Sequence, residues 1–133
     1  MQKQLKEQIK YWHDSSLKNF EAAKSLYKLK HYDSCLFFCH LSLEKIIKGL
    51  VVINIKESAP YMHDLVRLTV IAEIEITKEQ KDYLEVITGF NMAGRYNEYK
   101  LQFYKQCTKE YTQEWLAISK KLLLWLKEKY PKE

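Results

Sequence analysis

The sequence is poor in the residue types that break helices and form tight turns. It contains 3 Gly and 2 Pro among 133 residues, whereas β-hairpins and sheet-rich folds depend on those residues at their turns. Hydrophobic residues make up 47% of the chain, which provides enough material for a core and argues against disorder. Two separate cores in a chain of this length would each be marginal. We therefore predict one all-α domain over residues 1–133.

Cysteine is also scarce, and its number is odd. The 3 cysteines and the absence of a signal peptide argue against a disulfide framework. His31, Cys35 and Cys39 do recur at four-residue steps, with His40 beside them. Structural zinc normally takes four convergent ligands, usually from turns. We therefore interpret the two thiols as small core residues and predict no metal and no cofactor.

A long hydrophobic run is missing as well. The most apolar run, residues 46–55, is too short to span a bilayer and contains Lys48. Residues 1–10 are polar and charged, without the apolar region of a secretory signal. We therefore expect a cytoplasmic protein with no membrane partner.

Arginine is rare although the chain is basic. The net charge is +5 and the pI about 9.0, which suits an acidic partner such as RNA, a nucleotide or an acidic protein. Arg67 and Arg95 are the only arginines, and arginine is the residue that holds phosphate at two points. The excess of lysine fits a solvated surface equally well.

Apolar residues recur at steps of three and four, the pattern of amphipathic helices that pack as an antiparallel bundle. We predict four to five helices, over residues 4–29, 32–50, 65–71, 77–94 and 108–129. Asp33 is a candidate cap of the second helix, and Asp64 or His63 of the third. Residues 77–80 match a capping box that opens the fourth helix, and Gly94 is its expected end. Residues 95–107 are predicted to be irregular or weakly helical.

The second predicted helix is apolar on two sides. One side forms the regular core stripe, while Phe37, Phe38 and Leu41 make a second apolar side in its first half. A helix that is apolar nearly all round is buried on several sides. We therefore expect it to be central, or to present its second side to another copy of the chain in a homodimer.

The same helix carries a row of polar residues. Asp33, His40 and Glu44 lie near one another, with Lys45 and Lys48 adjoining. Charged groups beside so apolar a surface must be paired or must line a cleft. Two alternatives stay open, an internal salt-bridge network between helices and a functional groove.

Arg95 and Tyr96 follow the expected end of the fourth helix. Arg95 is placed to hold a phosphate with two hydrogen bonds, or to pair with Glu44 and tie the segment down. Tyr96 could stack on a base. The motifs of hydrolytic nucleophiles and phosphate-binding glycine loops are missing from the sequence.

Three segments together resemble the HEPN family: residues 32–50, the His-Asp-Leu of residues 63–65, and the Ala-Gly-Arg-Tyr of residues 93–96. The resemblance implies a bundle of four or five helices that commonly forms a homodimer with a groove between the subunits. It also implies frequent genetic pairing with a minimal nucleotidyltransferase, often as a toxin–antitoxin system.

Many members of this family are metal-independent endoribonucleases that carry an Arg and, after four to six intervening residues, a His. In this sequence Lys100, Leu101 and Gln102 occupy the positions where that His should stand. We therefore lean against an enzyme and predict a non-catalytic module that binds a nucleotide, RNA or a nucleotidyltransferase partner at a dimer groove. The alternatives are a ribonuclease toxin with a relocated His and a purely structural interaction domain. The candidate catalytic residues are Arg95, His40 and His63, and the candidate ligand-binding residues are Arg95, Tyr96, His40, Glu44, Lys45, Lys48 and Asp33.

Overall fold

The computed structural model describes the backbone of residues 2–95 and 97–132, and the side chains of residues 2–91 and 98–132. Within these residues the chain is all-helical, with no strand, which confirms the predicted fold class. There are six helices, one more than the upper limit of our prediction. They are α1 (Lys3–Lys28), α2 (Tyr32–Ile55), α3 (Leu65–Ile71), α4 (Lys78–Arg95), α5 (Asn97–Gln106) and α6 (Lys109–Lys127).

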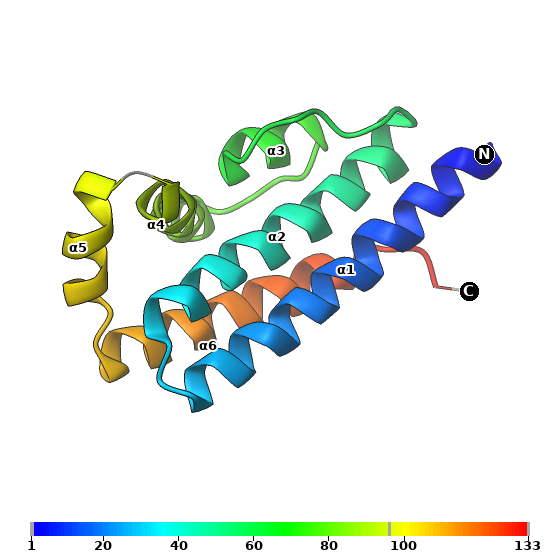
Figure 1. Cartoon of the computed structure of the whole chain (residues 1–133). Coiled ribbons are helices and arrows are strands. Elements are labelled where there is room, and N and C mark those ends of the chain that lie inside the picture. The colour runs from blue at the N-terminus through cyan, green and yellow to red at the C-terminus, as the bar shows by residue number, and fades with distance from the viewer. Residues whose placement is uncertain (1, 96, 133) are drawn as a thin grey trace.

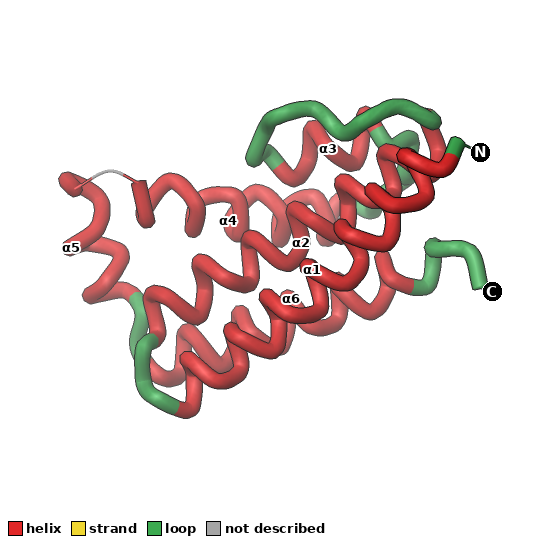
Figure 2. Tube along the Cα trace, turned by 45° about the vertical axis from the view of Figure 1, so that its right-hand side comes forward, coloured by secondary structure: helices red, strands yellow, loops and turns green. Residues whose placement is uncertain are grey.

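Three long helices form the body of the molecule. α1, α2 and α6 run along one another, and α3 and α4 cover the opposite side of α2 (Figure 1). α5 closes one end of the bundle, whereas both chain termini lie at the other end, as the turned view also shows (Figure 2). Among the described residues no helix has the length and apolarity needed to cross a membrane.

α2 is the central helix, as its two apolar sides predicted. Its core residues, including Leu36, Leu43 and Ile47, are fully buried. α1 and α2 are joined by a reciprocal pair of hydrogen bonds, in which the Ser16 hydroxyl donates to the Ser42 carbonyl (2.6 Å) and the Ser42 hydroxyl to the Ser16 carbonyl (2.9 Å). These small residues let the two helices approach closely without leaving a buried polar group unpaired.

Gly49 marks a second close approach, next to the end of the chain. A Cβ at this position would overlap the hydroxyl of Tyr130, which lies just after α6. That hydroxyl donates to the Ile46 carbonyl at 2.6 Å. Burial raises the pKa of Tyr130 well above its ordinary value, so the phenol stays protonated and can donate this bond.

Side-chain caps fix the starts of three helices. Asp64 accepts from the backbone N–H of Arg67 at the start of α3 (3.2 Å). Thr77 and Gln80 form the predicted capping box, each side chain accepting from the other's backbone N–H (2.9 and 3.1 Å). Thr108 caps α6. Asp33 is not a cap, because His31 occupies that position of α2 and Asp33 lies in the first turn.

Two predicted helix ends and one predicted segment differ from the structure. α4 does not end at Gly94 but continues to Arg95, and residues 97–106, which were predicted to be irregular or weakly helical, form an α-helix. Among the described side chains of α5, Phe103 is the only apolar one in the buried core, so the apolar repeat that identifies a helix is weak there. A tertiary contact holds α5 in place instead, since the ring of Phe103 lies 5.5 Å from the ring of Phe90 on α4. α2 also extends past residue 50 to Ile55.

Candidate functional site

One side of α2 carries a buried ionic cluster, which we define as His40, Glu44, Lys48 and His63. The first three recur at four-residue steps and so lie along one side of the helix, and His63 comes from the segment before α3. Nδ1 of His63 donates to Oε1 of Glu44 at 2.8 Å, and Nζ of Lys48 donates to Oε2 of the same carboxylate at 3.0 Å. Nε2 of His40 lies 2.9 Å from the His63 carbonyl oxygen, to which it donates.

This cluster is almost completely shielded from solvent. The side chains of Glu44 and Lys48 are each 7% exposed, His63 is 25% exposed and His40 is fully buried. Burial acts to raise the pKa of Glu44, but the hydrogen bonds from His63 and Lys48 outweigh it, so the pKa lies below its ordinary value. Glu44 is therefore a carboxylate at neutral pH, and it compensates the buried ammonium of Lys48.

Two aromatic rings cover the ammonium of Lys48. Its Nζ lies 5.5 Å from the centre of the Trp12 ring of α1 and 5.9 Å from that of Tyr61. An ammonium within about 6 Å of an aromatic ring is attracted by its electron-rich face. Neither ring was among the predicted site residues. Trp12 belongs to the apolar stripe of α1, and Tyr61 stands in a connecting segment two residues before His63, so neither carried a distinguishing signal.

The structure divides the predicted polar row into separate parts. Lys45 points toward α1, where its Nζ donates to the Ser15 hydroxyl at 2.7 Å. Asp33 lies in the first turn of α2. Burial raises the pKa of Cys107 to about 12, and the negative charge of Asp33 adds to this effect. The row is therefore not one continuous groove of charges, because only His40, Glu44 and Lys48 gather with His63.

Arg95 and Tyr96 remain predictions, since the side chain of Arg95 and all of Tyr96 lie outside the described residues. Glu44, the partner considered for Arg95, accepts one hydrogen bond on each of its oxygens within the cluster. Its pairing with Arg95 stays a prediction.

The two helical cysteines lie in the core. Cys35 and Cys39 are fully buried, and the hydrogen bond that the Cys39 thiol donates to Cys35, together with burial, raises the pKa of Cys39 well above its ordinary value. A thiol in this state is a poor nucleophile and a poor metal ligand. Within the described part of the chain, no group of three or more His, Cys, Asp or Glu side chains is placed to hold a metal ion.

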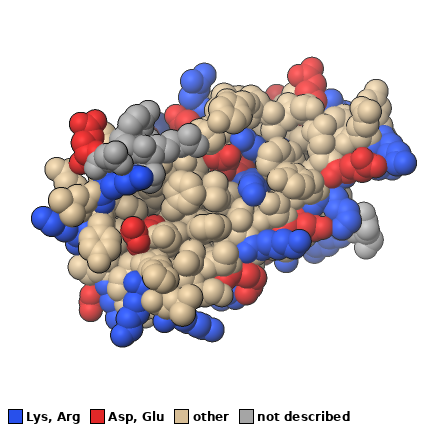
Figure 3. All heavy atoms as spheres, in the orientation of Figure 1, with Lys and Arg blue, Asp and Glu red and all other residues tan. Residues whose placement is uncertain are grey.

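An open, weakly charged surface adjoins the ionic cluster. Phe37 and Leu41, two turns and one turn before Glu44 respectively, are only half-buried on the outward side of α2, and the Phe37 ring meets that of Phe38 edge-on at 6.1 Å. Figure 3 shows that this face of the molecule is mostly uncharged, with most of its Lys, Arg, Asp and Glu toward the ends and edges and a few charged atoms near the centre. Such a surface suits contact with another protein surface.

The fold and the sequence can now be compared with known proteins. The HEPN domain profile matches residues 9–129. The crystal structure of TT1696 from Thermus thermophilus is similar to the chain, with a TM-score of 0.78 and 17% sequence identity over 92% of this chain and 98% of that one; at this identity the likeness supports the fold. No curated protein sequence matches the chain significantly. From the match over nearly its whole length, the chain belongs to the HEPN domain family.

Proposed function

We propose that the chain is a non-catalytic HEPN module that binds a phosphate-bearing ligand, a nucleotide or RNA, beside the outward side of α2 and works as a homodimer. The observation that supports this proposal is the ionic cluster itself. Charges are expensive to bury, and here they are buried along α2 next to the half-buried Phe37 and Leu41. Ionisable groups in such positions are candidates for functional sites.

The arrangement of the histidines supports a role without catalysis. His40 is fully buried, so it cannot reach a phosphodiester in a bound RNA. His63 is held by Glu44 through Nδ1, and the position after Arg95 that supplies a proton shuttle in related ribonucleases holds Lys100, Leu101 and Gln102 instead. Losing a proton shuttle typically reduces the rate by a factor of about 10² to 10⁴.

The binding proposal predicts that Arg95 is needed for the ligand and not for folding. Titrations of ATP, AMP and a short RNA at low salt should show binding that weakens as salt rises, because phosphate contacts release counterions. Arg95→Ala should abolish most of it. Arg67→Ala is the matched control, since Arg67 is the other arginine and is exposed on α3. If Arg95→Ala leaves binding intact and only lowers the melting temperature, the chain is a structural interaction domain and this proposal is wrong.

The homodimer is proposed to form through the open surface of Phe37 and Leu41. A charge placed there should separate the subunits, so Leu41→Glu should sediment as a monomer of about 16.0 kDa while the unchanged chain sediments as a dimer. Leu124→Glu is the control, because Leu124 is 47% exposed on α6. An unchanged chain that is monomeric at micromolar concentration would contradict the dimer. A nucleotidyltransferase seated on this surface is the alternative partner that the family suggests.

One observation favours a second function, an endoribonuclease with a relocated histidine. Glu44 orients His63 through Nδ1, as a carboxylate orients the general base of many hydrolases, and His63 is the most exposed member of the cluster. Purified protein should then cleave mixed RNA in the presence of EDTA, and both His63→Ala and Arg95→Ala should stop the cleavage. Cleavage that is absent, or that survives Arg95→Ala, rules this function out.

A further inference from the structure

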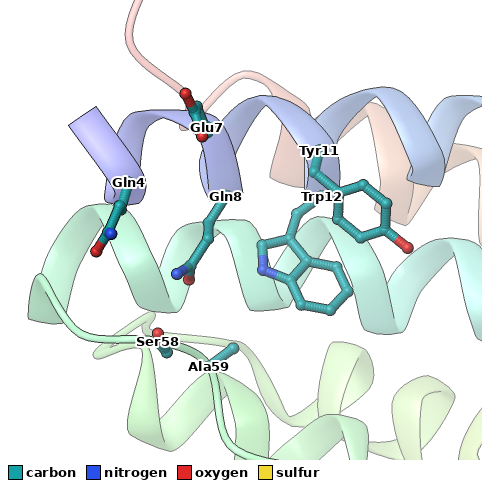
Figure 4. Close-up of a pocket in the computed structure, with 7 residues that line it drawn as sticks. All are labelled: Gln4, Glu7, Gln8, Tyr11, Trp12, Ser58 and Ala59. Carbon is teal, nitrogen blue, oxygen red and sulfur yellow. The ribbon is translucent and has the colours of Figure 1, made fainter.

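A cavity of about 240 Å³ lies where α4, α5 and the start of α6 meet, at the end of the molecule opposite the chain termini (Figure 1). This α5 cavity is separate from the ionic cluster. A cavity of about 560 Å³ beside α1 is not separate, because Trp12, which lines it (Figure 4), covers Lys48. The lining of the α5 cavity includes Val86, Gly89 and Phe90 of α4, Tyr99 and Phe103 of α5, and Tyr111 of α6.

The α5 cavity opens on the solvent side of α4, away from α2 and α3. On the inner side of α4, Ile87 is fully buried and the Thr88 hydroxyl accepts from the backbone N–H of Leu65 on α3 at 3.1 Å. Val86 and Gly89, which line the cavity, are exposed. None of the described side chains that line it carries a charge. The cavity therefore suits an uncharged ligand.

Gly89 lines the cavity although nothing in the described structure requires a glycine there. It lies inside α4 with a helical backbone, and a Cβ added to it would meet no neighbouring atom within 4 Å. Gly49 differs, because Tyr130 fills the space that its Cβ would take. A glycine inside a helix lowers the stability of that helix, and local rules of this kind are broken mainly at functional sites. Gly89 keeps space open beside the α4 backbone, as glycine does where a ligand approaches closely.

The hydroxyl of Tyr111 supplies a hydrogen-bond donor among the aromatic rings. Nε2 of Gln106, which also lines the cavity, donates to the Tyr111 oxygen at 3.2 Å, so the hydroxyl is oriented to donate its own proton elsewhere. Burial raises the pKa of Tyr111 above its ordinary value, which keeps the hydroxyl protonated. The ring of Phe90 lies 5.5 Å from that of Phe103 and 6.4 Å from that of Tyr111. Rings packed in this way lose little conformational entropy on binding.

The volume of the α5 cavity limits the size of its ligand. An engineered cavity of about 150 Å³ holds benzene, whereas pockets for drug-sized ligands begin at about 300 Å³. A volume of about 240 Å³ therefore has room for one ring with a small substituent, and it is too small for a ring joined to a sugar.

We propose that the α5 cavity binds a single uncharged aromatic ring that carries an oxygen acceptor, which is the chemistry of a phenol. The ring would occupy the space beside Gly89 and contact Phe103, because aromatic rings attract one another beyond the area that they bury. Its oxygen would accept from the Tyr111 hydroxyl. This site goes beyond the phosphate site proposed at Arg95, because its ligand carries neither a phosphate nor a charge.

The test is a fluorine NMR titration of the full chain with 4-fluorophenol, followed by displacement with p-cresol and with toluene. We expect saturable binding, and toluene should compete about 3- to 10-fold less well than p-cresol, the effect of losing one hydrogen bond. Tyr111→Phe keeps the ring and should weaken 4-fluorophenol binding by the same factor. Tyr104→Phe is the matched control, because Tyr104 is exposed on α5 and does not line the cavity.

Gly89→Leu tests the space itself. Leucine favours a helix and meets open space at this position, so the variant should fold and lose 4-fluorophenol binding. Ala117→Leu, at an exposed position of α6, should keep it. N-acetyltyrosinamide distinguishes two sources of the ring: affinity equal to that of p-cresol assigns it to a tyrosine of a partner protein, and lower affinity assigns it to a free phenol.

The outcomes also separate this site from the phosphate site. The proposal is overturned if 4-fluorophenol shows no saturable binding at millimolar concentration, or if Gly89→Leu or Tyr111→Phe binds it as the unchanged chain does. Toluene that competes as well as p-cresol would overturn the assignment of a phenol. Arg95→Ala should leave phenol binding unchanged and Gly89→Leu should leave phosphate binding unchanged, so either proposal can fail without the other.

Discussion

Replacing Glu44 with glutamine would test whether the ionic cluster stabilises the fold. The substitution keeps the shape of the side chain but removes its charge, which leaves the ammonium of Lys48 at 7% exposure without a counter-charge. Removing one partner of a buried ion pair costs about 3–5 kcal/mol. The amide oxygen of Gln can still accept one of the two hydrogen bonds, each of which contributes about 1.5–3 kcal/mol when a charge is involved. We therefore expect Glu44→Gln to lower the free energy of unfolding by on the order of 3 kcal/mol, a large share of the roughly 5–15 kcal/mol typical of a domain.

The same carboxylate should make stability depend on pH. The pKa of Glu44 in the folded chain lies below its ordinary value of 4.5, so its contribution is fully present above about pH 4.5 and is lost as the pH falls through the lower, folded pKa. Asp14, whose pKa the hydrogen bonds from Lys10 and His13 lower to about 2, acts in the same direction. Asp14 contributes equally to the unchanged chain and to Glu44→Gln, so its effect cancels in the difference between their free energies of unfolding. That difference should shrink as the solution is acidified below pH 4.5.

Urea unfolding followed by circular dichroism at pH 7 measures the effect. Glu85→Gln is the matched control, since Glu85 is exposed on α4 and its loss should change stability by less than about 0.5 kcal/mol. Adding Lys48→Met to Glu44→Gln removes the orphaned ammonium and should restore part of the loss. If Glu44→Gln behaves like Glu85→Gln, or if Lys48→Met restores nothing, the reasoning from buried charge is wrong.

The two described glycines should respond to alanine with opposite signs. Gly49→Ala would drive a methyl group into the Tyr130 hydroxyl and should destabilise the chain by about 1–3 kcal/mol. The methyl group of Gly89→Ala meets nothing within 4 Å and should stabilise α4 by up to about 1 kcal/mol. Urea unfolding of both variants checks the two signs. Tyr130→Phe should cost about 1–3 kcal/mol, because the Ile46 carbonyl loses its buried donor, and an unchanged midpoint would contradict that bond. Thr77→Ala removes the cap of α4 and should lower the thermal midpoint by an amount equivalent to about 1 kcal/mol.

Much of the fold was predictable because local signals agreed with the final packing. The apolar stripe of α1, the capping box at Thr77 and the cap at Asp64 each depend on residues close together in sequence. α5 was missed for the opposite reason, since its place is decided by one buried ring, Phe103, against Phe90 of another helix. Tertiary contacts of that kind leave no periodic signal.

The candidate site was predictable only in part. Steps of four residues brought His40, Glu44 and Lys48 to one side of α2, and this grouping is present in the structure. The sequence could not show that His63 would arrive from a segment 19 residues after Glu44, nor that Trp12 and Tyr61 would cover Lys48. Those contacts depend on how the segment before α3 folds back over α2, which no local pattern encodes.

The separation of contacts along the chain has a consequence for how the domain assembles. α1 and α2 are neighbours in sequence, joined only by residues 29–31, so their pairing closes a short loop at little entropic cost. α6 reaches the same helix from far along the chain, and the bond from Tyr130 spans 84 residues. We therefore expect the pair of α1 and α2 to form early and α6 to dock late. During synthesis the α6-facing side of α2 would stay uncovered until α6 has emerged, which leaves the nascent chain vulnerable to aggregation until that helix docks.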